Sequence, residues 1–140
     1  MMDSKLNAMP NLFSALHKKM MENHQQLLSH YGLSKIHLPY LMILSAHEDG
    51  LTQKEMVDQL FLDKGHASRA LRDLVDKHMI NKDDQTTYKN KYFINENGLK
   101  VVQAVRKQTM DLRKKVIESL TEEELVLFTK VIEKMIEVLE

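Results

Sequence analysis

One stretch of the sequence, residues 52–94, constrains the fold more than any other. It begins with Thr52 and Glu55, whose hydroxyl and carboxylate have the spacing of a capping box at the start of a helix. Apolar residues at helical spacing follow, and a short break at residues 61–62 ends this helix. Asp63 can cap a second helix. The stretch therefore begins with two short helices joined by a tight turn.

The second of these helices, expected over residues 63–78, divides into an apolar face and a polar face. A buried helix that holds a basic helix at the surface is how a helix-turn-helix presents side chains to the major groove. The inward positions are Ala67, Ala70, Leu71, Leu74 and Val75. The outward positions are Lys64, His66, Ser68, Arg69 and Arg72.

The residues that follow have the pattern of a β-hairpin. Residues 80–82 and 91–94 look like two short strands, and the polar, turn-forming segment 83–90 between them carries Lys89. A helix-turn-helix followed by a β-hairpin is a winged helix.

These residues together resemble the MarR family of multiple-antibiotic-resistance regulators. The run TQKEMVDQLFLDKGHASRALRDLVDKHMI is similar to that family's capped helix, turn, recognition helix and exit into the wing, and residues 94–98 look like its wing-to-helix junction. The resemblance covers nearly the whole chain. It implies a mainly α fold with a small β-wing, in which a winged helix-turn-helix lobe (38–95) lies between dimerisation helices (8–31 and 96–140).

The chain departs from the family pattern in four places. Phe61 stands at the turn, and His78 at the end of the recognition helix, where the family often has glycine. Gly65 and His66 replace a common Ser-Thr pair. Thr86 and Tyr88 stand where the wing usually has Asp and Arg. Since that Arg commonly enters the minor groove, the resemblance implies weaker minor-groove reading here.

The charge of the chain is unevenly distributed, although Lys and Arg balance Asp and Glu overall. Residues 64–115 hold 13 Lys and Arg against 6 Asp and Glu, whereas residues 1–63 and 116–140 are net acidic. Local charge, not total charge, marks a nucleic-acid footprint. The alternative is that charges segregate by chance in a charged sequence.

The composition also limits what the chain can do. Cysteine is absent, which excludes disulfides, thiolate zinc sites and thiol chemistry, and fits a cytoplasmic location. Four glycines leave little for a nucleotide cradle, and no acid pair with histidine support is visible. No apolar run approaches the ~20 residues that span a bilayer. We therefore expect neither an enzyme nor a membrane protein, and no cofactor.

Long amphipathic helices at both ends of the chain predict a homodimer. They have little within the chain to cover their apolar faces, and helices are stabilised mainly by packing. Two paired chains would present two recognition helices to half-sites about one DNA turn (~34 Å) apart. The alternative is an intramolecular bundle. The expected dimerisation residues are Leu12, Leu16, Leu125, Phe128, Ile132, Met135 and Leu139.

Arginines on the second helix are the leading candidates for reading bases. Arg69 and Arg72 can each bind guanine bidentately, although Arg72 could instead pair with Asp76. Phosphate contacts are expected from Lys64, Ser68, Lys89 and Lys91. His66 could contact a base or a phosphate, or could be a solvated surface residue.

The resemblance also implies a small-molecule effector pocket between the terminal helices and the lobe. Its candidate residues are His17, Met20, His24, Tyr40, Leu44 and Val105. The histidines lack metal-ligand spacing, because His17 and His24 are separated by ~10 Å of helical rise.

These features predict a sequence-specific DNA-binding regulator, in particular a repressor. It would act as a homodimer on a pseudo-palindromic operator of double-stranded DNA and be relieved by an effector. The alternatives are a winged-helix module for protein contact without specific DNA binding, and a metal-responsive regulator that uses histidines.

Overall fold

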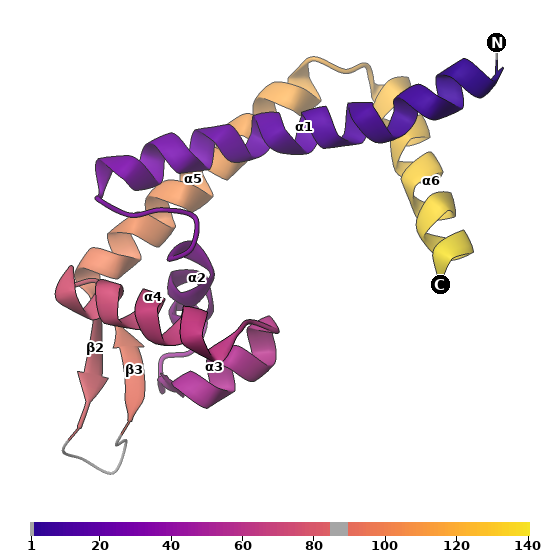
Figure 1. Cartoon of the computed structure of the whole chain (residues 1–140). Helices are drawn as coiled ribbons and strands as arrows, with labels where there is room; N and C mark the ends of the chain where they lie inside the picture. The colour runs from indigo at the N-terminus through magenta and orange to yellow at the C-terminus, as the bar shows by residue number, and fades with distance from the viewer. Residues whose placement is uncertain (1, 85–89) are drawn as a thin grey trace. The chain divides into compact units, whose positions relative to one another are not determined.

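The computed structural model describes residues 2–84 and 90–140, except for the side chains of residues 2, 3, 5 and 6. The chain forms two compact units, residues 1–106 and 107–140, and one helix, α5, runs from the first into the second (Figure 1). The elements are α1 (Met2–His30), α2 (Leu38–Ser45), β1 (Leu51–Thr52), α3 (Gln53–Leu60), α4 (Lys64–Asp76), β2 (Ile80–Asp83), β3 (Lys91–Ile94), α5 (Glu96–Glu118) and α6 (Glu122–Leu139).

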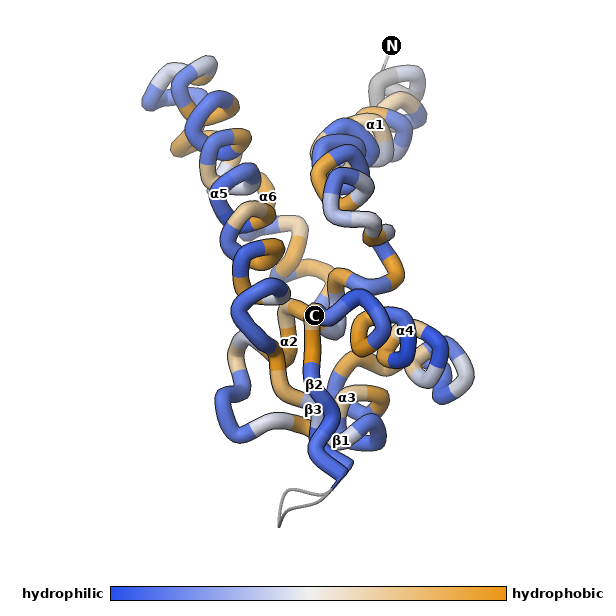
Figure 2. Tube along the Cα trace, turned by 90° about the vertical axis from the view of Figure 1, so that its left-hand side faces the viewer, coloured by the Kyte–Doolittle hydropathy of each residue, from blue (hydrophilic) through white to orange (hydrophobic). Residues whose placement is uncertain are grey.

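The expected elements are all present, with some differences at their ends. α1 begins earlier than the predicted residue 8 and includes Pro10 within the helix. Pro39 lies in the first turn of α2. Figure 2 shows hydrophobic and hydrophilic residues alternating along α1, as the sequence periodicity indicated. None of the described helices is both long and apolar enough to cross a membrane.

The ends of α1 and α4 share one backbone motif. After α1, the N–H of Leu33 donates to the carbonyl of Leu28 at 2.8 Å, with Gly32 at a φ of 72° between them. After α4, the N–H of Met79 donates to the carbonyl of Leu74 at 2.9 Å. These are Schellman bonds, which satisfy carbonyls at a helix end and need one left-handed residue. At α4 that residue is His78.

The wing belongs to a three-stranded antiparallel sheet in the order β1-β3-β2. β2 and β3 pair with Ile80 opposite Ile94, and the two-residue β1 adds Leu51 opposite Tyr92. The hairpin of β2 and β3 was predicted, whereas β1 was not. Two residues are too few for a periodic signal. Gly50, at a φ of 76°, leads into β1, where an added Cβ would lie 2.7 Å from the Phe93 ring.

The core of the first unit takes buried side chains from α1, α2, α3, α4 and α5 and from the sheet. Its fully buried side chains come from the apolar face of each helix and include Leu41, Leu44, Met56, Leu71 and Val101. The four predicted inward residues Ala67, Ala70, Leu71 and Leu74 are completely buried, and Val75 is partly buried. This packing fixes which face of α4 remains outside.

The junction between the wing and α5 has no spare room. Asn95 caps α5 by accepting the N–H of Gly98 at 3.1 Å. Its side-chain amide donates to the carbonyl of His78 at 2.9 Å. A Cβ at Gly98 would collide with the backbone carbonyl oxygen of Met79. Glycine at this position therefore allows α5 to cross the end of the α4–β2 connection.

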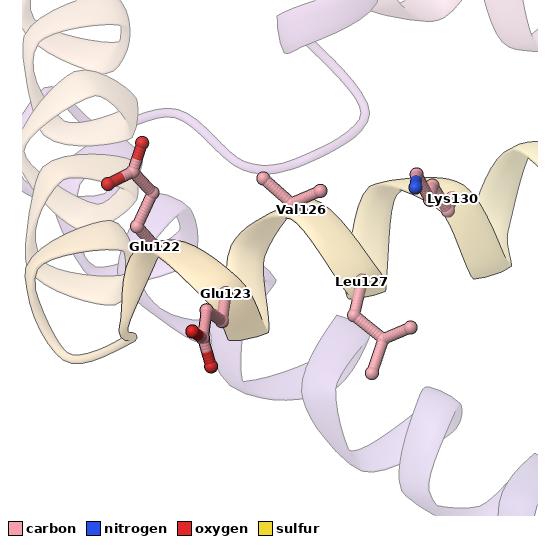
Figure 3. A pocket seen from close by; sticks show the side chains of 5 residues that line it. All are labelled: Glu122, Glu123, Val126, Leu127 and Lys130. Carbon is pink, nitrogen blue, oxygen red and sulfur yellow. The ribbon is translucent and has the colours of Figure 1, made fainter.

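The second unit contains the remainder of α5 and all of α6. Thr121 and Glu124 form a capping box, in which the N–H of Glu124 donates to the Thr121 hydroxyl at 3.1 Å. α6 has no buried residue. Val126 and Leu127 project from different sides of the helix, among charged residues that include Glu122 and Lys130 (Figure 3).

Candidate nucleic-acid interface

The turn between α3 and α4 is built on a left-handed residue. Phe61 has a φ of 54°, and the N–H of Leu62 donates to the carbonyl of Val57 at 3.3 Å. Glycine is favoured in this conformation because a Cβ crowds the backbone there. The Phe61 side chain is 92% exposed, so burial of the ring does not offset the strain. The two helices on either side nevertheless pack as the sequence predicted.

The start of α4 is fixed by a side-chain cap. The carboxylate of Asp63 accepts the backbone N–H of His66 at 3.1 Å, which confirms the predicted cap. One otherwise unsatisfied N–H of the first turn is thereby paired.

The outer face of α4 carries the residues expected to contact DNA. Lys64, Arg69 and Arg72 are exposed, and Ser68 is half-buried. The salt bridges of the described residues do not include Arg72, so the expected alternative pairing with Asp76 is not formed in this structure. Both guanidinium groups project from the side of α4 opposite its packed face.

The expected outward orientation of His66 is wrong. Its Nδ1 lies 2.8 Å from the hydroxyl of Tyr40, and the two rings stack with centroids 5.9 Å apart. The ring is half-buried because the first turn of α4 lies over α2. Burial raises the pKa of the Tyr40 hydroxyl above its ordinary value, and the nearby carboxylate of Asp63 raises it further. Periodicity places a residue on a helix face but cannot predict a partner on another helix.

A second bond between side chains holds α4 further along its length. His37 is buried, and its Nδ1 accepts the backbone N–H of Ser34 at 3.0 Å. Since that nitrogen accepts, Nε2 carries the proton and donates to Asp73 at 3.2 Å. This bond could not be predicted from the sequence, because the two residues belong to different parts of the fold and lie 36 positions apart.

The groove between α3 and α4 contains a third bond, between Gln53 and Ser68. The Gln53 amide nitrogen donates to the Ser68 hydroxyl oxygen at 2.7 Å. A hollow of about 540 Å³ on one side is lined by these two residues together with Lys54, Val57 and Lys64. A second hollow, of about 300 Å³, extends toward the wing and is lined by the same two residues and by Arg72, Val75, Asp76, Lys82 and Tyr92.

The wing adds further positive charge beside α4. The Lys82 ammonium lies 5.6 Å from the centre of the Tyr92 ring and 4.0 Å from a carboxylate oxygen of Asp84. Lys91 begins β3, paired with Asp83 in the strand register. Lys89, Thr86 and Tyr88 lie outside the described residues. Lys82 and Gln53 were missed in the sequence, since neither stands out until the helices and the wing are brought together.

Comparison with known proteins shows which regulators the chain is similar to. The MarR family profile matches residues 31–86, which contain α2, α3, α4 and β2. The crystal structure of MepR, a transcription regulator of the Staphylococcus aureus multidrug efflux pump MepA, has a TM-score of 0.81 at 25% identity. The alignment covers 92% of this chain and 96% of that one. The chain thus matches the MarR family over residues 31–86 and is similar to this solved structure over most of its length.

Two further structures extend the comparison. An S. aureus MepR–DNA complex has a TM-score of 0.77 at 26% identity, covering 94% of this chain and 99% of that one. YusO from Bacillus subtilis, at 16% identity and a TM-score of 0.79 over 98% of both chains, shares the fold. No curated protein gives a significant sequence match.

The expected MarR-type effector residues are not equally accessible. His17 is exposed on α1, and Met20 and His24 are half-buried there. Tyr40, Leu44 and Val105, by contrast, belong to the hydrophobic core. In the described part of the chain, no group of three or more His, Asp or Glu side chains is suited to hold a metal ion. The metal-responsive alternative therefore finds no support there.

Proposed function

We propose that this protein is a MarR-family, sequence-specific DNA-binding transcriptional regulator, in particular a repressor that acts as a homodimer on a pseudo-palindromic operator. The observation that carries the proposal is the geometry of α4. Its apolar face is completely buried, which leaves Arg69 and Arg72 exposed on the opposite side, next to a wing that bears Lys82 and Lys91.

The contacts divide by chemistry. Arg69 and Arg72 would bind base edges in the major groove, because a guanidinium can bind guanine bidentately. Lys64 and Lys91 would bind phosphates, which position the protein without reading sequence. Lys89 is proposed for the same role from the sequence alone. His66 would contribute less than expected, since Tyr40 occupies its Nδ1.

The MepR–DNA complex supports this proposal, because that protein aligns with 94% of this chain at 26% identity. Charge supports it as well. Residues 64–115 hold a surplus of seven positive charges, and this segment contains α4, the wing and most of α5. A nucleic-acid footprint depends on such local charge.

The dimer is proposed from the apolar residues of the terminal helices. Leu12, Leu16, Phe128 and Leu139 are between 48% and 86% exposed. Leu125, Ile132 and Met135 are half-buried. A second copy of the chain would cover these side chains, and burial of apolar area contributes roughly 25 cal/mol per Å².

An effector that relieves DNA binding is proposed with a restricted site. Of the six residues expected to form its pocket, only His17, Met20 and His24 have accessible surface in this structure. A ligand that reaches Tyr40 must displace core packing, and would then break the bond to His66 in the recognition helix.

Selection from a random duplex library with the purified full chain would test the function. We expect one pseudo-palindromic sequence to be enriched, and its affinity to fall with salt at a slope near −0.9 per phosphate contact. Six to ten contacts would lower affinity by about 10³–10⁵ between 50 and 200 mM salt. Sedimentation at micromolar concentration should give a dimer. A monomer that retains no duplex at low salt would refute the proposal.

A further inference from the structure

The hydrogen bond between Gln53 and Ser68 has a polarity that the chain itself dictates. The Gln53 amide nitrogen lies 2.7 Å from the Ser68 hydroxyl oxygen and 3.4 Å from the carbonyl oxygen of Lys64. A backbone carbonyl can only accept a hydrogen bond, so the group that faces it must be the NH₂ of the amide. Both amide hydrogens are therefore directed at α4.

This arrangement leaves the Ser68 hydroxyl hydrogen available. A serine in a helix often donates to the carbonyl four residues earlier, which here belongs to Lys64. Gln53 donates to that carbonyl instead and also to the Ser68 oxygen. Within the described residues, the Ser68 hydroxyl donates to no acceptor. It is thus a donor that remains free for a ligand.

Gln53 offers the complementary group. With its NH₂ committed to α4, its carbonyl oxygen is an acceptor, and it is not among the buried unpaired atoms of the described residues. The pair thus offers one donor and one acceptor, on side chains that are only half-buried. Hollows on either side carry Lys54 and Lys64 in one and Arg72 and Lys82 in the other. The pair therefore lies between cations that would hold a DNA backbone.

We propose that Gln53 and Ser68 act together as one base-reading unit that binds the major-groove edge of adenine. The Ser68 hydroxyl donates to adenine N7, and the Gln53 carbonyl oxygen accepts from the N6 amino group. This is the donor–acceptor pattern by which a single Asn or Gln binds adenine. The inference rests on the proposed DNA-binding function and replaces the phosphate contact expected for Ser68.

The acceptor distinguishes a base from a phosphate. A phosphate offers only acceptor oxygens, so the Gln53 carbonyl oxygen would gain nothing from it and would be repelled. An adenine edge satisfies both groups of the pair. Gln53 is also a positioning residue, because it keeps the Ser68 hydroxyl from turning back to its own helix.

The test compares sequence preference rather than affinity alone. Random-library selection with the full chain and with Gln53→Met, Ser68→Ala and the double variant would be followed by affinity measurements on the duplex that the unmodified protein enriches most. We expect each single variant to lose adenine preference at the same position of each half-site, with affinity falling roughly 5- to 150-fold. The double variant should be no weaker than the weaker single variant.

Two controls separate a reading role from a structural one. Ser68→Thr keeps the hydroxyl and should keep the adenine preference, whereas Lys54→Ala should weaken all duplexes equally. Replacement of that adenine by 7-deazaadenine removes the N7 acceptor and should weaken binding by the unmodified protein but not by Ser68→Ala. This replacement tests the inference even if a variant folds poorly.

Each outcome decides between the proposals. If the variants weaken every duplex equally and leave base preference unchanged, the pair contacts a phosphate and the inference is wrong. Independent, multiplying effects of the two substitutions would also refute it. If the unmodified protein enriches no sequence at all, the proposed function fails, and the base-reading role fails with it.

Discussion

Replacement of His78 by glycine should stabilise the protein. His78 occupies the left-handed position of the Schellman motif after α4, with a φ of 60°. Its side chain is exposed, and its backbone carbonyl, which accepts from Asn95 and Asn97, remains in a glycine variant. The substitution therefore removes backbone strain while it keeps the hydrogen bonds of the junction.

The magnitude follows from two opposing terms. Relief of a left-handed backbone contributes about 1–2 kcal/mol for a residue with a Cβ. Glycine in turn costs about 0.4–1 kcal/mol through the greater freedom of the unfolded chain. We expect a net gain of about 0.5–1 kcal/mol in unfolding free energy.

Gly32 is the matched control for His78, because it occupies the same position of the same motif after α1, at a φ of 72°. A Cβ there would meet only the Lys77 ammonium nitrogen, at an ordinary distance of 3.7 Å. Gly32→Ala should therefore cost about 0.5–1 kcal/mol, because the backbone strain exceeds the gain from a less flexible unfolded chain.

Thermal unfolding followed by circular dichroism, at one fixed protein concentration, measures both variants. The expected shifts are roughly 2–4 °C, upward for His78→Gly and downward for Gly32→Ala. Urea titration checks that the slope of free energy against denaturant is unchanged. A lower melting temperature for His78→Gly, with Gly32→Ala behaving as expected, would show that the histidine ring stabilises the junction and that the reasoning is wrong.

Three other predictions concern the interface and its supports. Arg69→Ala should lose about 1–3 kcal/mol of binding free energy on the best duplex, together with its sequence preference. Lys91→Ala should weaken binding to all duplexes alike and reduce the slope of log affinity against log salt by about one. Anisotropy titrations on cognate and random DNA distinguish the two results. Tyr40→Phe should lower unfolding free energy by about 1 kcal/mol because His66 loses its partner. The pKa of Tyr40 is raised in the folded state, so its contribution to the free energy of unfolding is complete below pH 10 and is lost as pH rises through the folded pKa. The unmodified protein should therefore lose stability above pH 10 more steeply than Tyr40→Phe. Gly98→Ala should destabilise by about 2 kcal/mol or more, measured by urea unfolding, because its methyl group meets a backbone carbonyl; an unchanged midpoint would contradict that packing.

The sequence predicted the helices because their signals are local. Thr52, Asp63, Asn95 and Thr121 each place an oxygen where the first turn of a helix has unsatisfied N–H groups, and all four act as caps in the structure. The inward face of α4 was equally predictable, because a period of 3.6 residues assigns each position to a face.

The side-chain bonds between elements were not predictable in this way. Tyr40 and His66 are separated by 26 positions, and Gln53 and Ser68 by 15. No periodicity relates residues on different elements, so His66 was placed on the surface by its helical position alone. Conversely, Phe61 and His78 stood out in the sequence as departures from glycine, and both have a positive φ. At both positions the backbone has the left-handed conformation that favours glycine, although the residue is not glycine.

The bonds from α2 and its approach to α4 also determine how the recognition helix is aimed. His66 and Asp73 are seven residues apart, close to two full turns, so their bonds to Tyr40 and His37 lie on the same side of α4. A helix fastened at two points along one side cannot roll about its own axis without breaking both bonds. Arg69 lies between these two points, so its direction is set when the protein folds, and the ordering cost that a freely rolling helix would incur on meeting DNA has already been met.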